Sequence, residues 1–223
     1  MPGYHLVNLG LHLACAFLVY LLGRLWGGSA LAPALGALFF ALHPLQAEVV
    51  NYISSRSETL AACGGLGSLL AYAHWRRGGP AWLYGVSLGA LVCGLLSKST
   101  ALAWPLVLAL YEGSQPGTGP RRWRPHLGYW LAAGLYLLFT QGMVAKALGQ
   151  PVRPLGVQLF TQLKAGAYYL YLTAVPLQLS VEHPFAEALS PWSLPVVLAA
   201  LLLASLGVVL WRLSTPDGFS LAG

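Results

Sequence analysis

The chain has 223 residues, of which 57% are hydrophobic and only 8% are charged. An ordinary soluble domain carries roughly a quarter of its residues as Asp, Glu, Lys and Arg, so this chain has too few charges to cover a water-soluble surface. The formal net charge is +6, and the basic residues cluster at the ends of apolar runs, which favours lipid and topology signals over nucleic-acid binding. Because a backbone in lipid must satisfy its own polar groups, we predict an all-α, polytopic transmembrane helical bundle.

The lengths of the apolar runs predict the membrane segments. Since a transmembrane helix needs about 20 mostly apolar residues, we expect about seven to eight segments, some of them short or re-entrant. They are residues 4–26, 31–42, 59–75, 80–96, 100–111, 126–148, 157–175 and 194–213. In 157–175, Gln162 and Lys164 would be costly facing lipid, so there we prefer a re-entrant or interfacial segment to a full span.

The positive-inside rule orients these segments. If the first helix runs from outside to inside, the cytoplasmic side receives Arg24, Arg76, Arg77, Arg121, Arg122 and Arg124. The other side then receives Arg56, Lys98, Lys146 and Arg153. No internal repeat and no Gly or Ser linker divides the chain, so we predict one transmembrane domain over 1–213 and a disordered tail over 214–223.

Cysteines and scattered histidines carry little functional signal. Cys15, Cys63 and Cys93 lie inside apolar runs without CxxC spacing, so neither a disulfide framework nor a zinc site is implied and we interpret them as small packing residues. The three histidines at positions 5, 12 and 74 are interpreted as packing or interfacial residues.

The first polar block that could carry chemistry lies between two short apolar runs on the outer side. His43 precedes Pro44, which breaks a helix, so its imidazole is expected to point into an aqueous cavity. Glu48 would share a helix face with a tyrosine four residues later, and Arg56 follows in the same block. The alternative is that these residues only cap helix ends, with Ser57 as an N-cap.

Two further polar groups lie on the same side. Lys98 sits between two runs that are too short to span comfortably, and a cation at such a depth needs an anionic partner. That partner is expected to be Glu48, Glu58 or a lipid phosphate, unless Lys98 merely extends its ammonium group to the membrane surface. Glu182 and His183 again place a carboxylate and an imidazole before a proline, or else form an ordinary polar loop.

Together these segments predict a substrate-binding site at one membrane face, made by His43, Glu48, Arg56, Lys98, Glu182 and His183. Cations could neutralise the phosphate of a lipid-linked substrate while a carboxylate activates an acceptor hydroxyl. No phosphate-binding loop, metalloprotease, serine-hydrolase or dinucleotide motif is present in the sequence.

Several motifs give the chain a family resemblance. They are GYHLVNL at 3–9, LHL at 11–13, FFALHPL at 39–45, ISSRSE at 53–58, LLSK at 95–98, PL at 105–106, YE at 111–112, YL at 169–170 and PLQLSVEHPF at 176–185. In this order they resemble the membrane region of the transmembrane O-mannosyltransferases that carry tetratricopeptide repeats, and of their bacterial relatives. The similarity covers nearly the whole chain.

The resemblance implies a GT-C glycosyltransferase fold that uses a polyprenyl-phosphate sugar as donor and transfers the sugar to a hydroxyl of a protein acceptor. The family's catalytic acid is expected in a first outer loop, upstream of Met1, and the tetratricopeptide repeats are expected after the last segment. Acid–base catalysis alone contributes about 10² to 10⁴-fold, so we expect this chain by itself to be inactive or nearly so. A divalent metal is possible, but no metal ligand is assigned.

The resemblance also implies a location and partners. We expect the bacterial inner membrane with the active face toward the periplasm, the endoplasmic reticulum membrane being the alternative. Expected partners are membrane lipid, the lipid-linked donor and a protein acceptor. Two other functions stay open, namely a transporter or flippase for a lipid-linked or anionic solute and a non-catalytic membrane scaffold.

Overall fold

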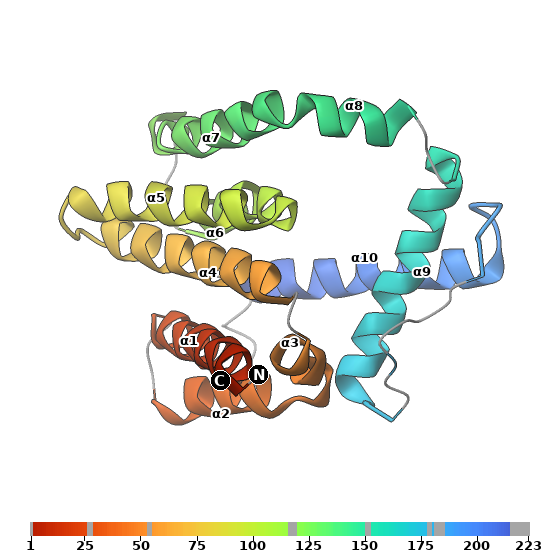
Figure 1. Cartoon of the computed structure of the whole chain (residues 1–223), viewed down its shortest axis with the longest axis horizontal. Helices are drawn as coiled ribbons and strands as arrows, with labels where there is room; N and C mark the ends of the chain where they lie inside the picture. Colours follow the sequence, from red (N-terminus) through yellow and green to blue (C-terminus); the bar gives the residue numbers. More distant parts are fainter. Residues whose placement is uncertain are drawn as a thin grey trace. The chain divides into compact units, whose positions relative to one another are not determined.

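Every regular element of the residues that the structure describes is a helix (Figure 1). The structure is a computed structural model and describes residues 2–25, 29–52, 55–115, 120–149, 153–177, 180 and 186–214. The all-α part of the predicted fold class is therefore confirmed. The chain clusters into two units, Met1–Gln141 and Gly142–Gly223; that both belong to one domain over 1–213 stays a prediction. Of the predicted tail, residues 215–223 lie outside the described residues.

Unit 1 contains most of the helices. They are α1 (Pro2–Arg24), α2 (Leu31–Leu42), the 3₁₀ turn η1 (Pro44–Gln46), α3 (Ala47–Asn51), α4 (Arg56–Arg76), α5 (Trp82–Ser97), the 3₁₀ turn η3 (Ser99–Ala103), α6 (Trp104–Ser114), the 3₁₀ turn η4 (Pro120–Trp123) and α7 (His126–Phe139). Within this unit α7, α5, α4 and α1 lie in successive layers, and α2 packs on the other side of α1 (Figure 1).

The helix ends have local causes. α4 ends at Arg76, and Gly78, two residues later, has a φ of +93°. The amides of Gly78 and Gly79 donate to the carbonyls of Trp75 and His74 at 3.1 and 3.0 Å. A residue with positive φ after a helix is the usual glycine stop. α5 ends because Lys98 is extended, with φ −158° and ψ 144°, so the predicted interruption at 97–99 is confirmed.

One predicted segment is divided in the structure. Residues 126–148 were expected to form a single span, but α7 ends at Phe139 and α8 (Gln141–Gly149) begins after Thr140. The Thr140 hydroxyl donates to the carbonyl of Tyr136 at 2.8 Å, and a threonine that bonds back to the preceding turn favours a helix end or bend. The prediction of one continuous helix there was wrong.

The core of unit 1 depends on the close approach of α4 and α5. A Cβ atom added at Gly64 would lie 2.7 Å from the carbonyl oxygen of Ala90 and 2.9 Å from the Cα of Gly94, so only glycine fits between the two backbones. Small residues at such crossings are typical of helices that pack in lipid. Buried Leu91 and Leu95 of α5 complete this contact.

A buried polar network links three of these helices. The hydroxyl of Ser87 in α5 donates to the carbonyl of Ser68 in α4 at 2.7 Å. It lies 3.0 Å from the Ser68 hydroxyl and 2.7 Å from the hydroxyl of Tyr129 in α7. Since the single proton of Ser87 is used toward the carbonyl, the two other hydroxyls donate to it. All three side chains are buried, so the network satisfies groups that would otherwise be costly to bury.

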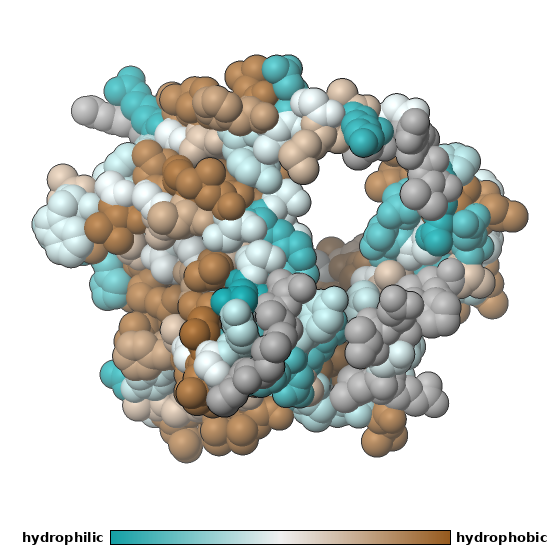
Figure 2. Space-filling model, viewed as in Figure 1, coloured by the Kyte–Doolittle hydropathy of each residue, from teal (hydrophilic) through white to brown (hydrophobic). Residues whose placement is uncertain are grey.

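Apolar side chains of α1 and α2 are exposed and polar side chains of α1 are buried, which is the reverse of the pattern in a water-soluble bundle. Leu6 and Phe17 of α1 are 67% and 59% exposed, whereas Asn8 and His12 of the same helix are buried. No residue of the apolar helix α2 is buried, and wide hydrophobic areas appear on the face seen in Figure 2. Contiguous exposed apolar surface marks an interaction with lipid or protein.

Among the described residues, one helix is long and apolar enough to cross a membrane, Gly3–Arg24, and a second candidate arises if the bent pair Leu31–Leu42 and Pro44–Asn51 is one span. Three further apolar helices are shorter, Trp82–Ser97, His126–Phe139 and Leu194–Val209. The predicted polytopic membrane bundle therefore stays a prediction.

Unit 2 contains α9 (Leu155–Ala174) and α10 (Leu194–Ser214), which pack against each other. The Lys164 ammonium group donates to the carbonyl of Ala186 at 2.8 Å, and the Thr161 hydroxyl accepts from the amide of Ala188 at 3.1 Å. These bonds anchor the residues before α10 onto α9. α9 is unbroken over 20 residues, so the predicted segment 157–175 contains no turn that would make it re-entrant. Whether it is interfacial or a full span stays a prediction.

Candidate ligand-binding cavity

Unit 1 contains a partly open cavity of about 350 Å³ near the start of α4. Its wall is mostly apolar with a few polar groups, the usual character of small-molecule sites. The lining residues are His12, Cys15, Phe40, Gln46, Val49, Glu58, Thr59, Ala61, Ala62, Thr100 and Trp104. Segments far apart in the sequence, from α1 to α6, thus converge on one space.

The α1 wall is fixed by two polar side chains. The Asn8 amide donates to the carbonyls of Val50 and Tyr52 at 3.3 and 3.1 Å, which holds α1 against α3. The His12 Nε2 donates to the carbonyl of Ala41 at 3.0 Å, and its ring stacks on Phe40 with centroids 5.4 Å apart. His12 is therefore a packed histidine, as expected, but it also faces the cavity.

A charged pair lies at the rim. Glu58 lines the cavity and forms an ion pair with Lys98, so of the partners proposed for this lysine the structure selects Glu58. The two side chains are 54% and 34% exposed. In an exposed pair the attraction is weak, and an incoming anion can compete for the ammonium group.

Of the predicted site residues, the four that the structure describes, His43, Glu48, Arg56 and Lys98, do not line the cavity itself. His43 is buried and its Nδ1 accepts from the amide of Leu45 at 3.2 Å, so it caps η1, as in the alternative interpretation. Arg56 lies over the ring of Tyr4, 4.9 Å from the centroid. Glu48 is exposed on α3. The predicted substrate contacts of these residues stay predictions.

The neighbours of the predicted residues do line it. Gln46, Glu58 and Thr100 come from the same segments as His43, Arg56 and Lys98. α4 begins at Arg56, so its N-cap position is Ser55, whose side chain makes no capping hydrogen bond to the helix. Ser57 lies inside the helix, and the alternative prediction of Ser57 as N-cap was wrong. Glu182 and His183 lie outside the described residues.

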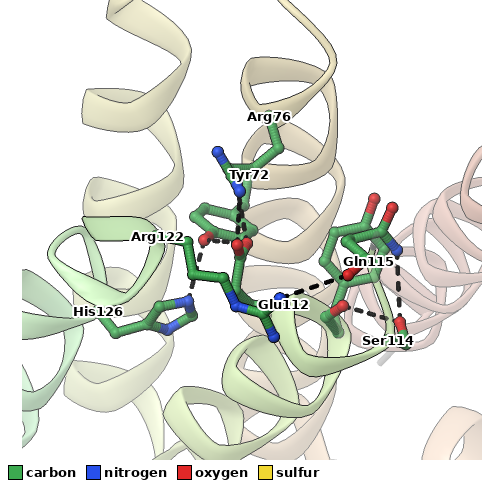
Figure 3. A network of polar contacts seen from close by, with 8 residues as sticks. Tyr72, Arg76, Glu112, Ser114, Gln115, Arg122 and His126 are labelled. Carbon is green, nitrogen blue, oxygen red and sulfur yellow. Dashed lines mark hydrogen bonds and ion pairs between the residues drawn. The ribbon is translucent and has the colours of Figure 1, made fainter. Parts of the chain in front are cut away.

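A second polar cluster, missed by the sequence analysis, lies at the other end of α4 (Figure 3). Arg76 of α4 makes two hydrogen bonds to the Glu112 carboxylate of α6, the one from Nε being 2.8 Å long. The Tyr72 hydroxyl also donates to Glu112 at 2.8 Å and lies 2.9 Å from the Nε2 of His126 in α7. Glu112 is fully buried.

This cluster holds the carboxylate in its charged form. Burial by itself raises the pKa of Glu112, but hydrogen bonds from Arg76 and Tyr72 outweigh it and leave the pKa below its ordinary value. Since Tyr72 gives its proton to Glu112, His126 donates from Nε2, and the buried Nδ1 of His126 has no hydrogen-bond partner among the described residues. The cluster is closed and charge-balanced, so it is suited to joining helices.

Within the described residues, no three His, Cys, Asp or Glu side chains are placed to share a metal ion. The possible divalent metal stays a prediction.

Part of this chain is similar to curated proteins. Protein O-mannosyl-transferase Tmtc2 of Drosophila melanogaster is 34% identical over 116 residues, which are 49% of this chain and 12% of that protein. Protein O-mannosyl-transferase Tmtc1 of the same organism is 33% identical over 121 residues, 51% of this chain and 13% of that protein. The chain thus spans about an eighth of the length of the curated relatives it matches. No protein-family model and no solved structure matches it.

The similarity supports a relationship between about half of this chain and these two proteins.

Proposed function

We propose that this chain is part of a membrane-embedded, GT-C-like glycosyltransferase domain and that its cavity receives a polyprenyl-phosphate sugar, a donor for O-mannosyl transfer to a protein hydroxyl. The observation that carries the proposal is the cavity at the start of α4, with Glu58 in its wall and Lys98 paired to it at the rim. The partial similarity to two protein O-mannosyl-transferases supports the same chemistry.

The donor's chemistry matches the cavity. A polyprenyl-phosphate sugar has an apolar chain, an anionic phosphate and a polar sugar. Lys98 supplies a cation for the phosphate, and Gln46 and Thr100 supply hydrogen-bonding groups for the sugar. The exposed apolar side chains of neighbouring helices supply a surface for the polyprenyl group. Because Lys98 is held by a partly exposed carboxylate, phosphate binding exchanges one anionic partner for another.

A membrane location is part of the proposal and is supported by the exposed leucines and buried polar groups of α1 and α2. Arg56 near the start of α4 contacts Tyr4 near the start of α1, and Cys63 further along α4 contacts Cys15 further along α1, so the two helices run in the same direction. Arg24 and Arg76 therefore end these helices on the same side, opposite the cavity. By the positive-inside rule, these arginines face the cytoplasm and the cavity lies at the opposite membrane face. In a bacterial inner membrane, that face is the periplasmic one.

We further propose that the isolated chain binds the donor without turning it over. Glu58 is the only carboxylate among the described lining residues, and it is paired with Lys98. Its carboxylate is therefore already engaged by the Lys98 ammonium group, and no second carboxylate among the described lining residues is placed to activate an acceptor hydroxyl. Sugar transfer by the purified chain from polyprenyl-phosphate mannose would contradict this assignment.

Binding of polyprenyl-phosphate mannose to the chain in lipid nanodiscs tests the site. Lys98→Ala is expected to weaken binding about tenfold, a change of ~1.4 kcal/mol, whereas Glu58→Gln is expected to tighten it because the ammonium group is freed. Lys146→Ala, which removes an exposed lysine of unit 2, is the matched control and should change nothing. Absence of binding by the unaltered chain, or equal affinities of all variants, would overturn the proposal.

A further inference from the structure

Two cysteines from different helices meet beside the cavity, and one of them, Cys15, lines it. The Sγ atoms of Cys15 in α1 and Cys63 in α4 lie 3.2 Å apart, although 48 positions separate them in the sequence. Each thiol also reaches a backbone carbonyl of the opposite helix, Cys15 toward Thr59 at 3.7 Å and Cys63 toward Leu11 at 3.6 Å. The pair is therefore held in register from both sides.

The third cysteine provides a contrast. All three cysteines are free thiols. Cys93 of α5 is exposed, whereas Cys15 is buried and Cys63 is half-buried. Cys15 lines the cavity, so a small apolar reagent that enters this space reaches the pair. The chain thus contains one thiol pair and one isolated thiol, which differ in the product that they can form.

We propose that Cys15 and Cys63 form a redox modification site, at which a small disulfide oxidant converts the two thiols into a disulfide bond between α1 and α4. The bond needs an S–S distance of about 2.05 Å, so the sulfur atoms must approach by about 1 Å from their separation of 3.2 Å. The cross-link would fix the α1 wall of the cavity to α4. This inference does not depend on which donor the cavity binds.

The reaction balances with a disulfide as the oxidant. The thiolate of one cysteine attacks a sulfur of the reagent, which forms a mixed disulfide and releases one reduced thiol of the reagent. The second cysteine then attacks the cysteine sulfur of the mixed disulfide, and the second half of the reagent leaves as a thiol. Two protein thiols are oxidised and one reagent disulfide is reduced, so no further oxidant is required.

4,4′-Dithiodipyridine tests the proposal on the full chain in nanodiscs, alongside a Cys93→Ser variant. The variant is expected to release two thiopyridone molecules per chain, to lose two hydrogen atoms in mass and to retain no pyridyl adduct, with the peptides that contain Cys15 and Cys63 linked until a phosphine reductant is added. If the variant does not fold, the unaltered chain serves in its place. It should in addition carry one pyridyl adduct at Cys93 and release a third thiopyridone.

The controls separate proximity from reactivity. In Cys15→Ser the thiol of Cys63 should keep its pyridyl adduct, because no partner is left to displace it. Two results on the unaltered chain would overturn the proposal. One is separate pyridyl adducts on both Cys15 and Cys63, and the other is that both of these thiols stay unreacted while Cys93 is modified.

Discussion

The two ends of α4 carry ion pairs in opposite surroundings. Glu58 and Lys98 pair at the rim of a cavity with both side chains partly exposed, whereas Arg76 binds a Glu112 carboxylate that is fully buried. The ends are about 27 Å apart at 1.5 Å per residue, close to the thickness of a bilayer's hydrocarbon core. An exposed pair can exchange partners at little cost, but a buried carboxylate that loses its partner cannot. The first end is therefore suited to binding, and the second to holding helices together.

Breaking the buried pair should have the largest effect on stability. Arg76→Met leaves the Glu112 carboxylate buried without its cation, so we expect a loss of about 3 kcal/mol in the free energy of unfolding. The double variant Arg76→Met with Glu112→Leu should recover most of that loss, since no buried charge remains. Unfolding in mixed micelles by a denaturing detergent measures both. Equal stability of the single variant and the unaltered chain would show that the two ends do not differ.

The glycine crossing gives the next largest effect. Gly64→Ala should lower the free energy of unfolding by about 1–3 kcal/mol, because the added methyl group overlaps the backbone of α5. Gly67→Ala on the same helix is the control, since its Cβ would lie 4.0 Å from the nearest atom, the Cβ of Ala90, and alanine favours helix over glycine. If both changes had the same sign in thermal unfolding, close approach at Gly64 would not be the cause.

A smaller effect is expected in the hydroxyl network. Tyr129→Phe removes one buried hydrogen bond to Ser87 and should cost about 1 kcal/mol, because Ser87 keeps its two bonds to Ser68. Tyr136→Phe alters the same helix without touching this network and should be near neutral. The comparison can be made by chemical unfolding of both variants, and a neutral Tyr129→Phe would contradict the assignment.

The smallest effect on stability is expected at the cavity end. Lys98→Ala breaks an exposed pair and should change the free energy of unfolding by at most about 1 kcal/mol, even though it weakens donor binding. Thermal unfolding of Lys98→Ala beside Arg76→Met sharpens the comparison between the two ends. A loss as large as that of Arg76→Met would show that the rim pair has a structural role.

The helix positions were largely predictable from the sequence because apolar runs are bounded by residues that stop helices. α2 has the predicted limits, and α4, α5, α9 and α10 differ from prediction by a few residues. The break at Thr140 was not predictable, since a single threonine inside an apolar run has no strong preference for ending a helix.

The site was predicted only as a set of segments. Which side chain of a segment faces inward depends on how the segment is rotated about its axis, and the sequence does not give that rotation. In the structure the residues that line the cavity are Gln46, Glu58 and Thr100, whereas the prediction had named their neighbours His43, Arg56 and Lys98. The Arg76–Glu112 pair joins residues 36 positions apart, which no local rule predicts. One signal was available, because a carboxylate at the end of an apolar run requires a cation and Arg76 was already assigned to the same side.

The bonds from Asn8 to the carbonyls of Val50 and Tyr52 have a consequence for biosynthesis. A ribosome makes position 8 before either acceptor, and the nearer one, Val50, is added 42 residues later. During that interval the amide of Asn8 must be satisfied by water or by the insertion machinery, since an unpaired amide is costly in hydrocarbon. In the proposed membrane location, α1 is therefore expected to wait at the translocon and to leave it together with the segment from α2 to α3.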